Sequence, residues 1–271
     1  MTETTTTLSA EEVWLAIQSE AEQVVEKEPA LASYYYAAIL KHNNLAEAIS
    51  FELANKLNTS TVPSMSLREL ITQTLEENPA VYQAMVQDIC AYKDRDPACD
   101  KYCLPLLYFK GFHALQTHRI AHQLWLSGRQ FLALYLQNKM SQQFGVDIHP
   151  GARIGGGIMI DHATGVVIGE TCVLGNDISI LHSVTLGGIG CEGGDRHPKI
   201  GDGVLLSVGA KVLGNIHIGE GVRVGAGSVV LTDVPAHTTV AGVPAQFVGQ
   251  AAEDQPALSM QHVWQKMRCD D

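Results

Sequence analysis

Four histidines between residues 149 and 197 stand out, because two of them lie next to an aspartate: His149, His162, His182 and His197. Asp147 precedes the first by two residues, and Asp161 directly precedes His162. A histidine supported by a carboxylate is a common general base near neutral pH, since the carboxylate selects the tautomer and stabilises the imidazolium. This stretch therefore indicates proton-transfer chemistry.

An aliphatic residue recurs every six positions in this part of the chain. The repeat residues are Ile148, Ile154, Ile160, Val166, Ile178 and Val184, then Ile200, Leu206, Val212, Ile218, Val224 and Val230, with Cys172 filling the remaining place. A period of six differs from the 2.0 of a strand and the 3.6 of a helix, and is typical of a parallel β-helix of hexapeptide repeats. The repeat residues, Cys172 included, should point inward.

The same repeat brings Asp147 and His162 together. They are fifteen residues apart, close to one coil of about eighteen residues, so they should lie on adjacent coils near one corner. The repeat is interrupted between Val184 and Ile200, and we expect this insertion to leave the prism as a loop on a binding face. Arg196 and His197 lie in that loop.

The first 140 residues have a different pattern and predict an all-helical domain. Ser9 with Glu12, and Ser66 with Glu69, have the spacing of a capping box, and Pro79 should open a further helix. An apolar helix is expected over 105–140, interrupted at Gly111 and Gly128, as either a central core helix or a subunit interface. We thus expect an α+β protein: helical residues 1–140, a left-handed β-helix over 141–250, and a mobile tail over 251–271.

Bulk composition limits the possible functions of the 271-residue chain. A net charge of −11 argues against a nucleic-acid partner and against an anionic membrane surface. No apolar run reaches the roughly 18–20 residues that span a bilayer, and the N-terminus lacks the features of a secretory signal. The six cysteines form no CxxC pair and are expected to be reduced thiols in a cytoplasmic protein.

Longer motifs resemble those of bacterial serine O-acetyltransferases. They are Asp147-Ile-His-Pro, Asp161-His-Ala-Thr-Gly, Val184-Thr-Leu-Gly-Gly and Gly194-Asp-Arg-His-Pro-Lys, with further similarity at Arg95-Asp-Pro-Ala and Leu106-Leu-Tyr-Phe-Lys-Gly-Phe-His-Ala-Leu-Gln. The resemblance covers about residues 10–250. It implies transfer of an acetyl group from acetyl-CoA to the hydroxyl of L-serine, the first step of cysteine biosynthesis, with no metal.

The resemblance also implies roles for individual residues. His162 would remove the proton of the serine hydroxyl, and Asp147 would orient that imidazole. Arg196 would bind the substrate carboxylate, while Asp96 and Asp161 would receive its ammonium group, with His197 nearby. The residues expected along the cofactor are Gly187, Gly188, Gly209, Lys211 and Arg223.

The resemblance further implies a homotrimer with its pocket between neighbouring prisms, two trimers forming a hexamer, and feedback inhibition by L-cysteine at the amino-acid site. Many members of the family end in an isoleucine that enters cysteine synthase. This chain ends Met267-Arg-Cys-Asp-Asp271, and two carboxylates are costly in an apolar pocket, so we do not expect that complex.

Three other functions stay open from the residues alone. The acceptor could be homoserine or a sugar. A metal-dependent hydratase of the carbonic anhydrase kind uses the same prism and histidines, although it has no use for a large helical domain. A non-catalytic assembly protein would need neither the Asp147 and His162 pair nor a charged loop.

His118 and His122, four residues apart on a predicted helix, have a spacing that suits a metal, but packing or interface histidines explain them better.

Overall fold

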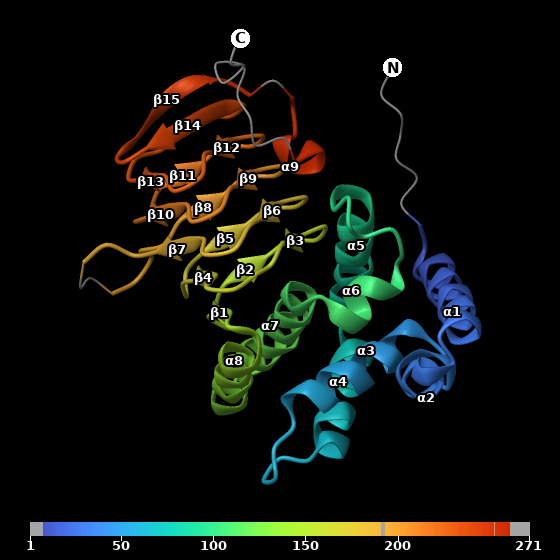
Figure 1. Cartoon of the computed structure of the whole chain (residues 1–271). Helices are drawn as coiled ribbons and strands as arrows, with labels where there is room; N and C mark the ends of the chain where they lie inside the picture. Colours follow the sequence, from blue (N-terminus) through green and yellow to red (C-terminus); the bar gives the residue numbers. More distant parts are fainter. Residues whose placement is uncertain (1–7, 191–192, 252, 261–271) are drawn as a thin grey trace, which may run out of the picture.

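A computed structural model describes residues 8–190, 193–251 and 253–260. A helical N-terminal half is followed by a prism of short strands (Figure 1). The helical elements are α1 (Ala10–Lys27), η1 (Pro29–Leu31), α2 (Ala32–Tyr35), η2 (Tyr36–Leu40), α3 (Leu45–Leu57), α4 (Ser64–Glu77), α5 (Pro79–Arg95), α6 (Cys103–Tyr108), α7 (Lys110–Leu126), α8 (Gln130–Phe144) and, near the C-terminus, α9 (Pro256–Ser259).

The starts of the first helices follow local sequence signals, with one exception. Ser9 caps α1 through a complete capping box with Glu12, as predicted. Pro79 is the first residue of α5, also as predicted. The prediction that Ser66 caps α4 is wrong, because the helix already starts at Ser64, directly after Pro63. Proline is tolerated at a helix start but not inside a helix, so Pro63 limits how far α4 can extend toward the N-terminus.

The apolar stretch predicted as one interrupted helix forms three, α6, α7 and α8. The break at Gly128 is confirmed, and this glycine adopts a φ of 80° between α7 and α8. The break predicted at Gly111 lies two residues earlier, at Phe109, and Gly111 is inside α7. A Cβ at position 111 would clash with the carbonyl oxygen of Ile160. The glycine is therefore needed for close approach of α7 to the prism rather than for a helix break.

Three parallel sheets make the faces of the prism. Sheet A is β1 (Asp147–Ile148), β4 (Val167–Ile168), β7 (Thr185–Gly187), β10 (Lys211–Leu213) and β13 (Val229–Val230). Sheet B is β2 (Arg153–Ile154), β5 (Val173–Leu174), β8 (Lys199–Ile200) and β11 (His217–Ile218). Sheet C is β3 (Met159–Ile160), β6 (Ser179–Ile180), β9 (Leu205–Leu206), β12 (Arg223–Val224) and β14 (Thr238–Gly242), followed by the antiparallel strand β15 (Ala245–Gln250).

The predicted fold class is confirmed, with the six-residue repeat filling the prism. All the repeat residues are buried except Ile154, which is partly buried, and Cys172 is inside at 1% exposed. Burial raises the pKa of the Cys172 thiol to about 12, so this thiol is inert core. The chain between β7 and β8 projects from the prism, as the insertion predicted (Figure 1).

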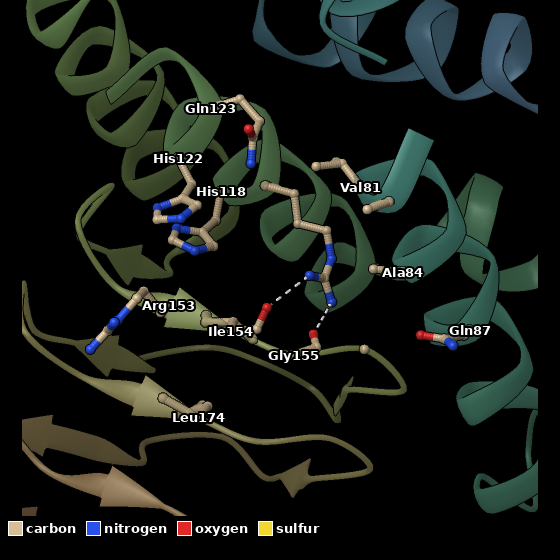
Figure 2. Close-up of a pocket in the computed structure, with 13 residues that line it drawn as sticks. Val81, Ala84, Gln87, His118, His122, Gln123, Arg153, Ile154, Gly155 and Leu174 are labelled. Atoms are coloured by element: carbon tan, nitrogen blue, oxygen red, sulfur yellow. Dashed lines mark hydrogen bonds between the residues drawn. The ribbon is translucent and has the colours of Figure 1, made fainter. Parts of the chain in front are cut away.

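Buried polar contacts join the helices to the prism. Arg119 on α7 pairs with the fully buried Asp88 on α5. It also donates to the carbonyl oxygens of Ile154 and Gly155, which are the dashed lines in Figure 2. Asp88 also accepts the N–H of Ile158. A cavity of about 520 Å³ lies beside this pair, between α5, α7 and sheet B. These hydrogen bonds hold the two halves together, and they provide partners for backbone groups at the end of β2 and just before β3.

The segment after β15 differs from the mobile tail that we expected. Ala257 is fully buried, its N–H donates to the Gly203 carbonyl, and its carbonyl accepts from Ser179 Oγ at 2.8 Å. Residues 253–260 therefore pack on the prism. The rest of the predicted tail, residues 261–271, lies outside the described residues. Over the described ranges, no helix combines the length and apolar character needed to cross a bilayer.

Candidate active site

His162 lies on a widened corner between sheets C and A. In the first coil the register joins Asp147 to Val167, twenty residues apart, whereas the next coil joins Val167 to Thr185, eighteen apart. The two extra residues fall between β3 and β4, and His162 and Ala163 there have φ values of 54° and 60°. This left-handed backbone is uncommon for residues other than glycine, although Asp177, Ser183 and His237 also adopt it elsewhere in the prism. The His162 side chain is 75% exposed.

Asp147 lies next to this corner, on the coil below it. Its N–H donates to the Val166 carbonyl at 2.9 Å, and Gly165 donates to Gly145 at 2.7 Å. The Asp147 carboxylate accepts a 2.7 Å hydrogen bond from Gln137 on α8. In the described part of the chain no hydrogen bond joins Asp147 to His162. The carboxylate nearest to the ring is that of Asp161, 3.8 Å from His162 Nε2. Asp161 thus lies beside the imidazole, and Asp147 lies on the coil below.

Asp161 and Asp96 both lie near Tyr92, at the end of α5. Asp96 follows the last residue of that helix, and its carboxylate accepts the N–H of Ala98 at 2.8 Å. Tyr92, one turn earlier, hydrogen-bonds both backbone groups of Ile160. The pKa of Tyr92 is raised well above its ordinary value, first by burial and then by the negative charges of Asp88, Asp161 and Asp96. Tyr92 therefore fixes the end of α5, which carries Asp96, against Ile160, two residues before His162.

Arg196 and His197 lie at a different corner, between sheets A and B. Arg196 Nη2 pairs with Glu170 at 2.7 Å, and this hydrogen bond lowers the pKa of Glu170. The buried ring of His197 accepts from the Thr171 N–H and shares a 2.8 Å contact with its hydroxyl. Burial, with the positive charge of Arg196, lowers the pKa of His197. His149 adds a third polar group near Glu170, and burial lowers the pKa of its ring.

The two corners do not converge within one chain. Strand β4 of sheet A lies between Gly165 and Glu170, and five residues of extended chain span about 16 Å. The predicted site residues are therefore divided. The catalytic His162 and the substrate-binding Asp161, with Asp96 at the nearby end of α5, lie at one end of sheet A, and Arg196 and His197 lie at the other. A small substrate cannot touch both groups of one chain.

The predicted cofactor residues lie on later coils. Gly209 has a φ of 68° at the corner above His182, and the exposed Lys211 beside it donates to the Gly209 carbonyl at 3.1 Å. A Cβ at Gly187 would lie 3.1 Å from Leu213, and one at Gly188 would lie 3.3 Å from the Arg196 carbonyl oxygen. Arg223 is only 4% exposed, and its Nη2 lies 3.7 Å from Glu253 in the segment after β15. Lys211 is thus accessible, whereas Arg223 is covered.

Sequence reasoning missed Glu170, Gln137 and Tyr92. Glu170 follows a corner glycine just as Asp202 and Glu220 do, so its position in the sequence did not distinguish it. Gln137 and Tyr92 are ordinary helix residues in the sequence, and only their contacts with Asp147 and Ile160 show that they support the corner.

Comparison with known proteins accounts for both halves of the chain. Residues 13–117 match the family model "Serine acetyltransferase, N-terminal", and residues 197–232 match "Bacterial transferase hexapeptide (six repeats)". The serine acetyltransferase of Escherichia coli K12 is 55% identical over 248 residues, which are 92% of this chain and 91% of that protein. The chain belongs to the serine acetyltransferase family. It is an acyltransferase, and the predicted resemblance is confirmed.

Solved structures of the family share the fold over nearly the whole chain. The serine acetyltransferase of Vibrio cholerae superposes with a TM-score of 0.93 at 54% identity, covering 94% of this chain and 99% of that one. A family structure in complex with cysteine has a TM-score of 0.93 at 52% identity and covers 94% and 100% of the two chains. The soybean enzyme complexed with serine has a TM-score of 0.86 at 56% identity and covers 88% and 98%. A complex with CoA has a TM-score of 0.86 at 52% identity and covers 89% and 100%.

Proposed function

We propose that this chain transfers the acetyl group of acetyl-CoA to the hydroxyl of L-serine, with His162 as the general base. The observation that carries the proposal is the widened corner, which exposes the His162 side chain beside Asp161 and follows the coil that carries Asp147. Members of the family bind serine, cysteine or CoA in solved structures. The family name supports the further proposal that the product, O-acetyl-L-serine, is used in cysteine biosynthesis.

The proposed step needs no covalent enzyme intermediate. A ring nitrogen of His162 takes the proton of the serine hydroxyl while the hydroxyl oxygen bonds to the thioester carbon. The carbon–sulfur bond then breaks, and the CoA thiolate takes a proton from the imidazolium. Asp147 stabilises that imidazolium from the coil below. The buried Cys172, with its raised pKa, offers no competing nucleophile.

Substrate binding is proposed to use two copies of the chain. L-Serine carries an ammonium and a carboxylate a few ångströms apart, whereas Asp96 and Asp161 lie a sheet width away from Arg196. A neighbouring prism that brings its Arg196 and His197 to the corner of His162 supplies the positive charge for the carboxylate. Asp96 and Asp161 of the first chain supply the negative charges for the ammonium group. This supports a homotrimer with each site between two prisms. Acetyl-CoA would extend from the corner of His162 toward later coils, along Gly187, Gly188, Gly209 and Lys211. Arg223 would contact it only where the segment that carries Glu253 does not cover the guanidinium group.

Two trimers would associate through the helical halves. Apolar side chains of α7 and α8 stand in solvent in this single chain, with Phe131 93% exposed and Leu126 66% exposed. Such exposed groups are typical of a subunit interface. Native mass spectrometry tests the assembly: a hexamer is expected, and a monomer contradicts both the interface and the shared site.

Cysteine is proposed to inhibit by occupying the serine site. It carries the same ammonium and carboxylate as serine, so Asp96, Asp161, Arg196 and His197 can bind either amino acid. Initial rates should show competition between cysteine and serine, and a rate insensitive to cysteine contradicts this part.

We further propose that the enzyme acts in the cytoplasm. The residues that would contact a cysteine synthase lie outside the described part of the chain.

Acceptor profiling tests the reaction itself. Thiol release from acetyl-CoA is measured with L-serine, L-homoserine and sugars. L-Serine is expected to be the best acceptor, and His162→Ala to lower turnover by about 10²–10⁴-fold. His217→Ala, which removes a 71% exposed imidazole on sheet B, is the matched control and should keep full activity. If homoserine or a sugar gives a higher rate than L-serine, that compound is the acceptor and the proposal for serine is wrong.

A further inference from the structure

Gln137 on α8 contacts the carboxylate of Asp147. Helix α8 ends at Phe144 and packs against β1, whose first residue is Asp147 (Figure 1). The chain therefore turns back on itself, and Gln137, ten residues before Asp147, reaches it with its amide group. Gln137 Nε2 lies 2.7 Å from Asp147 Oδ1. An ionised carboxylate only accepts hydrogen bonds, so the amide N–H is the group that faces it.

Two features fix the place of Gln137 relative to the corner of His162. The buried residues of α8 recur at helical spacing: Ala133, Leu136, Met140 and Phe144. Gln137 directly follows one of them, so it lies at the edge of the buried face of the helix. Gly145 caps the helix with a φ of 66°, and its carbonyl accepts the N–H of Gly165 at 2.7 Å. Gly165 is three residues after His162, so the end of α8 is tied to the corner that carries the proposed base.

The hydrogen bond from Gln137 uses one oxygen of Asp147 and leaves the other. Within the described ranges, no second hydrogen bond or ion pair reaches this carboxylate. A distance of 2.7 Å is in the range of charge-assisted hydrogen bonds. Because the amide is neutral, it orients the carboxylate without cancelling its negative charge, whereas a lysine or arginine at this place would form an ion pair with it. Oδ2 therefore keeps its lone pairs for another partner.

We propose that Gln137 is a positioning residue for the acetyl transfer: it fixes the Asp147 carboxylate so that Oδ2 is available to the imidazolium of His162. This inference rests on the proposed function and adds a residue of the helical half to it. When His162 takes the hydroxyl proton, its ring becomes positive. A carboxylate that is already held in place stabilises this charge without having to reorient. Gln137 exchanges no proton and acts only through Asp147.

Gln137→Met removes the N–H and keeps nearly the same side-chain length. We expect kcat to fall by about 10–100-fold, the range for loss of a hydrogen bond to a charged group, with the KM for serine and for acetyl-CoA changed less than about threefold. Gln142→Met is the matched control. It makes the same substitution at an exposed position of α8 and removes a 2.9 Å hydrogen bond from Lys139, and it should keep the wild-type kcat.

A double-mutant cycle with Asp147→Ala tests whether the effect passes through Asp147. In that background Gln137→Met should change kcat by less than about twofold, because the carboxylate that it positions is already absent. An equal loss of kcat in the two backgrounds would mean that Gln137 acts on another part of the enzyme, and the inference would be wrong.

Gln137→Glu gives a pH signature that a loss of packing does not. At high pH the two carboxylates are both ionised and repel each other. At lower pH they share one proton, and a protonated carboxyl at position 137 donates as the amide did. The ratio of the variant kcat to the wild-type kcat should therefore rise at least about fivefold from pH 8.5 to pH 6.5. The charge of Asp147 also acts on His149, and taking the ratio removes the titration of His149 and His162 that both enzymes share.

The outcomes separate positioning from packing. A wild-type kcat in Gln137→Met overturns the inference. The pH signature of Gln137→Glu decides even where the Met variant does not fold, and a ratio that is independent of pH contradicts the inference. A wild-type enzyme that acetylates none of the acceptors overturns the proposed function and the inference with it, whereas the results above, measured on an active wild type, overturn the inference alone.

Discussion

The phenol of Tyr92 on α5 makes two hydrogen bonds to one residue of the prism, Ile160. It donates to the Ile160 carbonyl at 2.9 Å and accepts the Ile160 N–H at 3.0 Å. Ile160 is two residues before His162, so this contact ties the helical half to the corner that carries the proposed base. Gly111 on α7 leaves the space for it, because a Cβ there would clash with the same carbonyl.

Tyr92→Phe should lower the free energy of unfolding by about 1–3 kcal/mol, since both backbone groups of Ile160 lose a buried partner. Urea unfolding at constant protein concentration measures the change. Tyr36→Phe alters a side chain that is 60% exposed and should stay within about 0.5 kcal/mol of wild type. Equal stability of the two variants would show that the contact with Ile160 contributes nothing.

Asp147→Asn and Asp161→Asn should separate two roles at the same corner. If Asp147 stabilises the imidazolium, its amide variant lowers kcat by tenfold or more and leaves the KM for serine nearly unchanged. If Asp161 receives the ammonium group, its variant mainly raises that KM. Steady-state kinetics with serine as the varied substrate distinguishes them. The reverse pattern would make Asp161, 3.8 Å from His162, the partner of the base.

Arg196→Lys should raise the KM for serine by about 10–100-fold, because a charge-assisted and bidentate contact with a carboxylate is worth about 1.5–3 kcal/mol. Glu170→Gln should raise it less, since the 2.7 Å pair positions Arg196 and does not touch the substrate in this proposal. The depressed pKa of Glu170 keeps that pair formed above the ordinary carboxyl pKa, and it is lost as the pH falls through the depressed value. An unchanged KM in Arg196→Lys would remove Arg196 from the site.

The enzyme should lose stability in mild acid through His113. Burial lowers the pKa of this histidine to about 3 from an ordinary 6.5, and its Nε2 contacts the Leu106 carbonyl at 2.7 Å. Between those two values the unfolded chain binds a proton that the folded chain does not. The free energy of unfolding therefore falls as the pH drops below 6.5, by about 1.4 kcal/mol per pH unit for one such group.

His113→Gln tests this effect because the amide keeps a donor near Leu106 but does not titrate. Urea unfolding at pH 7.5 and pH 5.5, again at one protein concentration, should show a smaller acid loss in the variant than in the wild type. Identical losses would assign the acid sensitivity to other groups, such as the fully buried His118, whose pKa is also lowered.

The architecture could be predicted because local sequence patterns determine it. A side chain every six residues must point inward if short strands wind around a prism, and in the structure all of these residues are buried except the partly buried Ile154. The cap at Ser9, the helix start at Pro79 and the break at Gly128 likewise depend on backbone chemistry within a few residues. The motifs around His162 and Arg196 also predicted the family, which 55% identity to a known member confirms.

The geometry of the site was decided by tertiary contacts that no local pattern contains. From the sequence, Gly111 was predicted to interrupt a helix, but in the structure it lies inside α7. A glycine is needed there because a Cβ would clash with the carbonyl oxygen of Ile160. The separation of His162 from Arg196 depends on which corner each coil reaches, and two extra residues in the first coil widen the corner of His162. Side-chain types and spacing are properties of the chain, whereas the distance between residues on different corners is set only when the coils close into a prism.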